Sequence, residues 1–294
     1  MSTRSLQIGL RFSRGIFCSY VGSSCWPLQT TIKRTKVTKA SSKRWVQRQG
    51  SDMYAREAKE QGLRSRAAFK LLEIDQSHKI FKAGQTVIDL GFAPGSWTQV
   101  AVDHTRPNGR VLGIDILPAA PPKGAIAVQG DFMSPLVQAG IKEYLENPDE
   151  VEKRAVEGDQ TKQQESGQES GSARTREKQS APASAVDTVD VMLSDMLMNT
   201  SGNAFRDHAT SMDLSNVALD FALDTLRPGG SFVCKFYAGG EDSLLERRLR
   251  SAFDRVKREK PAASRGESRE QYFVATGKKK RRKVESVKGG GGRG

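Results

Sequence analysis

The chain has 294 residues, a formal net charge of +13 and 36% hydrophobic residues. That hydrophobic share is somewhat low for a fully packed protein, so part of the length is expected to be tail or linker. No run approaches roughly 18 consecutive apolar residues, which argues against a membrane span, and the three cysteines are too few and too scattered for a disulfide framework.

The first fifty residues contain ten basic side chains and no acidic one. Arginine, serine and threonine alternate there with single apolar residues, a composition typical of a mitochondrial transit peptide. Residues 1–42 are therefore predicted to be a transit peptide that directs the protein to the mitochondrial matrix. The alternative is a disordered basic arm that contacts RNA, and residues 33–48 are a candidate for such an arm if cleavage leaves them in place.

From residue 43 to residue 277, apolar runs alternate with helical patterns, which predicts one α/β domain. Such alternation gives a mostly parallel, Rossmann-like sheet with helices on both faces, and ligands bind at the carboxyl ends of its strands. Helices are predicted over 65–75, 96–103, 214–226 and 244–253, and strands over 86–90, 110–115, 125–128, 189–194, 231–236 and 271–275.

A glycine-containing loop, Asp89-Leu90-Gly91-Phe92-Ala93-Pro94-Gly95-Ser96-Trp97, follows the first strand and opens a helix. Glycines at such positions let a backbone approach a ligand closely. The loop is not G-x-G-x-x-G, which counts against a dinucleotide site. An aspartate just before the loop suits a ligand with a cationic or amine-bearing end.

Two further carboxylates follow at the ends of the next two strands. Asp115 could accept hydrogen bonds from a ribose diol, and Asp131 could accept one from an adenine amine. Each has a plainer explanation as a helix cap, and Trp97 could be a core residue. In this order, however, the loop and the two acids are typical of a site for S-adenosylmethionine (SAM), for which the candidate residues are Asp89, Gly91, Pro94, Gly95, Trp97, Asp115, Asp131 and Asp195.

Residues 146–186 contain no aromatic side chain and are dominated by Glu, Gln, Ser, Lys and Gly. Such a segment cannot bury enough apolar surface to offset its chain entropy. We predict a disordered insertion within one domain, because the strand and helix alternation resumes after it.

Residues 278–294 form a basic, glycine-rich tail with a net charge of +7. Its run from Lys278 to Val284 resembles a nuclear localisation signal, although it could equally be a solvated tail that adds nonspecific phosphate affinity. The two ends thus suggest different compartments, and the N-terminal signal is the more complete of the two.

Four separated motifs resemble those of the FtsJ (also called RrmJ) family of ribose 2′-O-methyltransferases, in that family's order. They are Arg64-Ser65-Arg66-Ala67-Ala68-Phe69-Lys70-Leu71, Ser194-Asp195-Met196, Phe232-Val233-Cys234-Lys235-Phe236 and Ser268-Arg269-Glu270. The likeness covers about 43–140 and 187–278, and is strongest to the branch that acts on large-subunit ribosomal RNA. The family's Lys-Asp-Lys-Glu tetrad matches Lys70, Asp195, Lys235 and Glu270.

The tetrad suits methyl transfer to a ribose 2′-hydroxyl, which is a poor nucleophile until its proton is removed. Lys235 interrupts an apolar strand, and a buried lysine needs a partner or a function. It is the candidate general base if burial or the neighbouring cation Lys70 favours its neutral amine. Asp195 could orient the lysine and the methyl donor, while Glu270 could hold Lys70 or the ribose. Taken alone, Lys70 could be an ordinary solvated helix residue.

Two departures from the family pattern stand beside this match. Met196-Leu197-Met198-Asn199 follows the motif aspartate where the family commonly has Met-Ala-Pro-Asn, and Phe92 and Ser96 replace the usual Ala and Gly of the glycine loop. No metal site is expected, because the three histidines form no ligand cluster.

The resemblance implies SAM-dependent 2′-O-methylation of a uridine in mitochondrial large-subunit ribosomal RNA, within the subunit or its precursor, by a monomer. One alternative is a nuclear or cytosolic methyltransferase for transfer RNA or precursor ribosomal RNA. Another is a non-catalytic RNA-binding assembly factor with the same fold. RNA affinity is expected from Arg64, Arg66, Lys70 and the segment 247–258.

Overall fold

The computed structural model describes residues 52–148, 150–151, 187–198 and 200–280. The predicted transit peptide, most of the predicted insertion and the tail from residue 281 lie outside the described residues. The helices are α2 (Met53–Glu60), α3 (Ala67–His78), α4 (Ser96–Thr105), α5 (Pro135–Glu146), α7 (Ala204–Thr225) and α8 (Asp242–Ala252), and the strands are β1 (Thr86–Leu90), β2 (Arg110–Asp115), β3 (Ala125–Gln129), β4 (Val189–Ser194), β5 (Leu226–Tyr237), β6 (Phe253–Glu259) and β7 (Glu270–Lys278).

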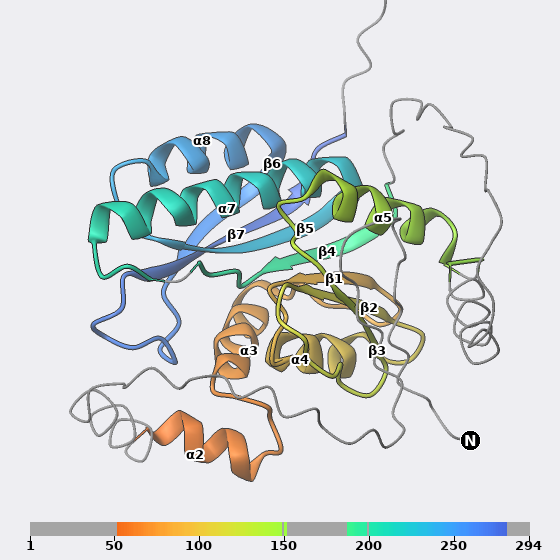
Figure 1. Ribbon diagram of the computed structural model, residues 1–294, viewed down its shortest axis with the longest axis horizontal. Coiled ribbons are helices and arrows are strands. Elements are labelled where there is room, and N and C mark those ends of the chain that lie inside the picture. Colours follow the sequence, from red (N-terminus) through yellow and green to blue (C-terminus); the bar gives the residue numbers. More distant parts are fainter. Residues whose placement is uncertain (1–51, 149, 152–186, 199, 281–294) are drawn as a thin grey trace, which may run out of the picture.

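The strands form one seven-stranded sheet in the order β3-β2-β1-β4-β5-β7-β6. The first five are parallel, while β7 runs antiparallel to both β5 and β6. Figure 1 shows α3 and α4 against one face of the sheet and α5, α7 and α8 against the other. The predicted α/β class, with a mostly parallel sheet and helices on both faces, is confirmed.

Two hydrophobic clusters account for this layering, one on each face of the sheet. Ile88 and Leu90 of β1 belong to the cluster that includes α7, whereas Val87 belongs to the cluster that includes α3 and α4. Because helices cover both faces, the central strands are buried along their whole width, and every residue of β4 is buried. The continuous apolar runs seen in the sequence follow from this double coverage.

The predicted elements differ from the structure in both halves of the chain, and the helices α2 and α5 were not predicted. The helix predicted over 214–226 begins ten residues earlier, at Ala204, where the Asn203 side chain accepts hydrogen bonds from the amides of Phe205 and Arg206. The strand β6 was not predicted, because only Phe253 and Val256 of its seven residues are buried. Its many charged side chains are typical of an exposed edge strand.

The described chain on either side of residues 152–186 packs into one hydrophobic core. Val151 is buried in the core cluster, and β4, which begins at Val189, pairs directly with β1. At the other end, Lys278 is the last residue of β7. Its side chain is 3% exposed, donates a hydrogen bond to the carbonyl of Leu226 and forms an ion pair with Asp187. The basic run predicted to start the tail therefore begins inside the fold.

None of the helices in the described part of the chain is long and apolar enough to cross a membrane.

Candidate active site

Lys235 and Asp195 meet at the carboxyl ends of two neighbouring strands. Ser194, the last residue of β4, lies beside Cys234 of β5. The residues that follow them, Asp195 and Lys235, are therefore brought to the same edge of the sheet. Lys235 Nζ lies 2.6 Å from the backbone oxygen of Asp195 and 3.0 Å from its Oδ1. The Lys235 side chain is only 7% exposed. A buried lysine held by one aspartate confirms that this residue is not part of a solvated face.

Lys70 and Glu270 form a second ion pair beside the first. Lys70 lies on α3 and Glu270 opens β7, and the distance from Lys70 Nζ to Glu270 Oε1 is 2.5 Å. Burial by itself would raise the pKa of Glu270, but the charge of the adjacent Lys70 and its hydrogen bond to Glu270, with smaller effects of other neighbours, together outweigh burial and lower that pKa below its usual value. Glu270 is therefore an ionised carboxylate at neutral pH, and Lys70 is not a solvated helix residue.

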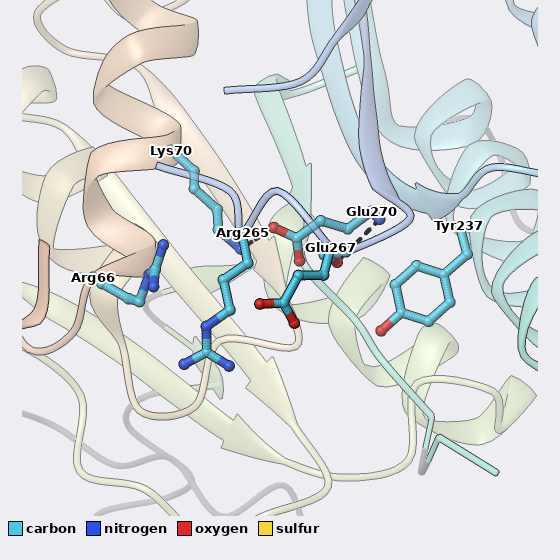
Figure 2. Close-up of a pocket in the computed structure, with 7 residues that line it drawn as sticks. Arg66, Lys70, Tyr237, Arg265, Glu267 and Glu270 are labelled. Atoms are coloured by element: carbon cyan, nitrogen blue, oxygen red, sulfur yellow. Dashed lines mark hydrogen bonds and ion pairs between the residues drawn. The ribbon is translucent and has the colours of Figure 1, made fainter. Parts of the chain in front are cut away.

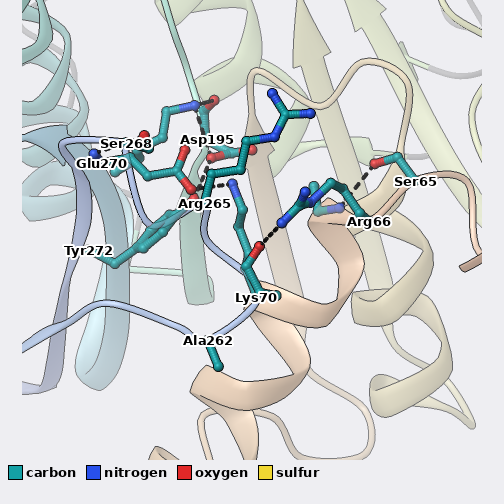
Figure 3. Close-up of polar contacts among 12 residues, drawn as sticks. Ser65, Arg66, Lys70, Asp195, Ala262, Arg265, Ser268, Glu270 and Tyr272 are labelled. Atoms are coloured by element: carbon teal, nitrogen blue, oxygen red, sulfur yellow. Dashed lines mark hydrogen bonds and ion pairs between the residues drawn. The ribbon is translucent and has the colours of Figure 1, made fainter. Parts of the chain in front are cut away.

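The two ion pairs are linked by Tyr272, a residue that the sequence analysis did not select. Its hydroxyl donates a hydrogen bond to Asp195 Oδ1 at 3.2 Å, and its ring centroid lies 5.9 Å from Lys70 Nζ. Burial, with Asp195 and Glu270 close by, raises the pKa of Tyr272 well above its usual value, so the hydroxyl remains a donor. Figure 3 shows these side chains converging from three separate elements. The sequence did contain a signal for Tyr272, because a tyrosine in an apolar strand has a buried hydroxyl that needs a partner.

A pocket of about 350 Å³ opens at the Lys70–Glu270 end of this group. Figure 2 shows charged side chains entering it from α3 and from the segment before β7, with the ring of Tyr237 opposite them. The lining residues are Arg66, Lys70, Tyr237, Arg265, Glu267, Ser268 and Glu270.

The glycine loop joins β1 to α4, and its two glycines are required by contacts within the protein. Gly91 has a φ of +78°, and a Cβ there would lie 2.8 Å from the Cα of Met196. Gly95 has a φ of +102°, and a Cβ there would lie 2.8 Å from Nη1 of Arg64. Protein atoms thus occupy the space that these glycines leave open.

The carboxylates at the strand ends differ in their surroundings. Asp89 is fully buried, accepts a hydrogen bond from Thr98 Oγ1 at 2.6 Å, and its Oδ1 has no partner among the described residues. Burial raises the pKa of Asp89 to about 7, and the charges of Asp195 and Asp115 add to the effect. Asp115 accepts hydrogen bonds from the amides of Ala93 and Leu117, at 2.9 and 2.8 Å, and so holds the glycine loop against β2.

Two other predicted cofactor residues have roles inside the fold. Asp131 is exposed just beyond β3 and accepts a hydrogen bond from the amide of Met133 at 2.9 Å. Trp97 is 2% exposed, and its indole nitrogen donates to the carbonyl of Ala67 at 2.8 Å. Trp97 is thus a core residue whose side chain ties α4 to α3. Pro94 is exposed at the loop's tip.

The arginines expected to contact RNA are largely used within the protein. Arg64 donates to the carbonyls of Pro94 and Ala120, at 2.6 and 2.5 Å, and Arg66 bonds to Asp52 and to the carbonyl of Ala263. In the segment 247–258, Arg248, Arg250 and Arg258 each pair with an acidic residue. Within the described ranges, no group of three or more histidine, cysteine or acidic side chains could hold a metal ion.

Comparisons with known proteins show which family the chain resembles. Residues 63–278 match the family described as FtsJ-like methyltransferase. The chain is 39% identical over 262 residues to ribosomal RNA large subunit methyltransferase E of Gluconobacter oxydans, covering 89% of this chain and 81% of that one. It is 37% identical over 298 residues to the mitochondrial rRNA methyltransferase 2 of Saccharomyces cerevisiae, covering 84% and 90%.

Among solved structures, a ribosomal RNA methyltransferase from Plasmodium falciparum superimposes with a TM-score of 0.56 at 25% identity. The match covers 74% of this chain and the whole of the other.

Proposed function

Because the chain belongs to the FtsJ-like methyltransferases, and is therefore a SAM-dependent RNA methyltransferase, we propose that it methylates the ribose 2′-hydroxyl of a uridine in mitochondrial large-subunit ribosomal RNA. The observation that carries the proposal is the pairing of Lys235 with Asp195 beside the Lys70–Glu270 ion pair. The named substrates of the relatives and the presequence-like N-terminus support the choice of RNA and compartment.

The residues at the strand ends suit SAM, which carries an ammonium and a sulfonium. Burial raises the pKa of Asp89, the nearby charges of Asp195 and Asp115 raise it further, and Asp89 Oδ1 lacks a partner among the described residues. Such a concentration of carboxylates favours a cationic ligand. We assign the ribose hydroxyls to Asp115, the adenine amine to Asp131, and the amino-acid end to the backbone of Gly91–Trp97 together with Asp89 and Asp195.

In the proposed reaction, Lys235 acts in its neutral amine form and accepts the proton of the ribose 2′-hydroxyl at Nζ. When bound, SAM supplies an electrophilic methyl group on its sulfonium. The carboxylate of Asp195 stabilises the ammonium that forms on Lys235, and the Tyr272 hydroxyl fixes that carboxylate. The Lys70–Glu270 pair lines the adjoining pocket and holds Glu270 ionised, so that it can accept a hydrogen bond from the ribose. Alignment of the reacting groups should supply much of the rate.

The alternatives are a nuclear or cytosolic location and a non-catalytic assembly factor. The nuclear alternative loses part of its support, because Lys278 is buried in β7 and Lys279 donates to the carbonyls of Arg250 and Ser251. The assembly factor is disfavoured by the tetrad, because a protein that only binds RNA has no need for a buried Lys235.

The experiment is to map ribose methylation along the large mitochondrial ribosomal RNA in cells that lack the protein. We expect one uridine to lose its methyl group and to regain it when the wild-type protein is restored, but not when Lys235→Ala is restored. Unchanged methylation throughout that RNA would refute the proposal. Imaging a C-terminally tagged protein tests the compartment, and a purely nuclear signal would contradict it.

A further inference from the structure

Tyr237 lies between two hollows at the edge of the active site. It lines the charged pocket together with Lys70 and Glu270, and it also lines a smaller hollow formed by Leu197, Met198, Thr200, Asp207, Thr210 and Ser211. That second hollow contains part of the loop in which this chain departs from the family pattern.

The register of β5 and β7 places this ring next to the catalytic groups. Tyr237 ends β5 two residues after Lys235, and side chains two residues apart point to the same face of a strand. Tyr237 pairs with Glu270, and Lys235 pairs with Tyr272, in the antiparallel ladder. Directly opposed residues share a face, so the four side chains form one patch, with Tyr237 at its open end.

The hydroxyl of Tyr237 has no hydrogen-bond partner within the described part of the chain, unlike that of Tyr272. Burial, together with Glu270, Asp207 and Asp195, raises the pKa of Tyr237, so the phenol is neutral. Figure 2 shows the ring turned toward the pocket, across from Glu267 and Glu270. A neutral, partly exposed ring in this position offers a flat surface to a ligand.

The opposite wall of the charged pocket carries a cation that remains accessible. The side chain of Arg265 is 47% exposed, and its Nη2 lies 3.8 Å from Oδ2 of Asp52. Arg66, by contrast, is 20% exposed and is bonded to Asp52 and to Ala263. Arg265 is thus better placed than Arg66 to meet a phosphate.

We propose that Tyr237 is the stacking surface for the base of the nucleotide that is methylated, and that Arg265 contacts a backbone phosphate beside it. This inference rests on the proposed function, which places the ribose at Lys235. Single-stranded RNA is commonly recognised with its bases splayed out and stacked on aromatic side chains. The pocket then takes an unpaired nucleotide, with its ribose between the ring and the tetrad.

The first test measures binding of a short, fluorescein-labelled oligouridylate to the full-length protein. Tyr237→Ala is expected to weaken binding roughly tenfold, because a stacked base is lost, and Tyr237→Phe to recover most of that loss. The matched control is Phe205→Ala, since Phe205 is 79% exposed and lines neither hollow. The proposal is overturned if Tyr237→Ala binds like the wild type, if Phe does not rescue it, or if Phe205→Ala loses as much affinity.

Salt dependence separates the two parts of the site. Arg265→Gln should weaken binding and reduce the slope of log affinity against log salt by about 0.7, the value for one phosphate contact on a single strand. Tyr237→Ala should leave that slope unchanged, because stacking releases no counterions. A reduced slope in Tyr237→Ala, or an unchanged one in Arg265→Gln, would contradict this assignment.

Methyl transfer to a ribosomal RNA transcript distinguishes this inference from the proposed function. We expect Tyr237→Ala to lower kcat/KM roughly tenfold while SAM binding and the melting temperature stay near the wild-type values. If the wild-type protein methylates the transcript and Tyr237→Ala does so equally well, the inference fails and the function stands. If the wild type methylates no ribosomal RNA while the oligouridylate results hold, the function fails and the stacking surface stands.

Discussion

Two oxygens of Asp195 hold the amine of Lys235, one from its backbone and one from its carboxylate. The backbone contact fixes where the amine lies, and in the proposed reaction the carboxylate stabilises the charge that the amine gains with a proton. Tyr272 fixes the same carboxylate from the other side. At the scale of single residues, the site is therefore a lysine whose position and product charge both depend on one neighbour.

Replacing Lys235 with alanine should lower kcat by about 10²- to 10⁴-fold, the usual contribution of a general base. Affinity for SAM, measured by calorimetry, should stay within about twofold. Lys82→Ala is the matched control, because Lys82 is exposed before β1, at the edge of the sheet opposite the site, and should leave transfer unchanged. Loss of SAM binding in Lys235→Ala would contradict the role assigned to this lysine.

Asp89 should make the stability of the fold depend on pH, because its folded pKa of about 7 lies above its ordinary value of 3.8. A carboxyl group with a raised folded pKa stabilises the fold at low pH, and that contribution is lost as pH rises toward the folded value. The wild-type free energy of unfolding should thus fall, relative to that of Asp89→Asn, between about pH 4 and pH 7 and then level off. Urea unfolding across this range measures it, and parallel pH profiles of the two proteins would refute it.

At the scale of elements, the antiparallel strand β7 is what brings Glu270 to the site. The parallel strands β4 and β5 present Asp195 and Lys235 at their carboxyl ends, whereas β7 runs the other way, so its first residue lies at that same edge. Tyr272 follows two residues later on the same face. The reversal of one strand thus completes the tetrad.

The segment after β4 lies against Gly91, so we expect Gly91→Ala to disturb both this segment and the glycine loop. Its φ of +78° costs a non-glycine residue about 1–2 kcal/mol, and the new Cβ would meet the backbone of Met196 at 2.8 Å. Urea unfolding should show a loss of at least that size. Gly240→Ala is the matched control, because a Cβ there meets nothing within 4 Å; equal stability losses in both variants would contradict this explanation.

At the scale of the whole molecule, the net charge of +13 belongs mainly to the two ends. Residues 1–50 contribute +10 and residues 278–294 contribute +7, so the intervening chain is slightly acidic. Within the described fold, many arginines bond to acidic side chains or to carbonyls, which leaves Arg265 as an accessible cation at the pocket. RNA affinity in the folded part is therefore local and not a property of the net charge.

Lys278 joins three parts of the molecule, because its ammonium bonds to Asp187 before β4 and to Leu226 at the start of β5. Lys278→Met should therefore cost about 1–3 kcal/mol, since the buried carbonyl of Leu226 loses a charged donor. Lys280→Met, at an exposed position, should cost nothing measurable. Thermal unfolding of the two variants decides the matter, and equal melting temperatures would show that Lys278 acts only as part of the basic tail.

The amino-acid sequence was sufficient to predict the five parallel strands β1 to β5, because buried parallel strands read as continuous apolar runs, but it did not predict the helix α5 between β3 and β4. The errors arise where an element has no such local apolar pattern. The strand β6 has no apolar run, and the early start of α7 depends on a cap at Asn203 within a polar stretch. The roles of Lys70 and Glu270 were predicted only through family motifs, because residues so far apart have no local pattern that pairs them.

The sequence by itself determined the α/β class and the glycine loop, because these depend on short-range periodicity and on a contiguous motif, and it predicted the tetrad only through its resemblance to a family. Only the tertiary structure decided which charges meet, that Tyr272 bridges them, that Trp97 is a core residue, and that Gly91 and Gly95 make room for protein atoms. It also decided the burial that raises the pKa of Asp89. Such properties arise from desolvation and from contacts between distant segments, which exist only once the sheet and its two helical layers have packed.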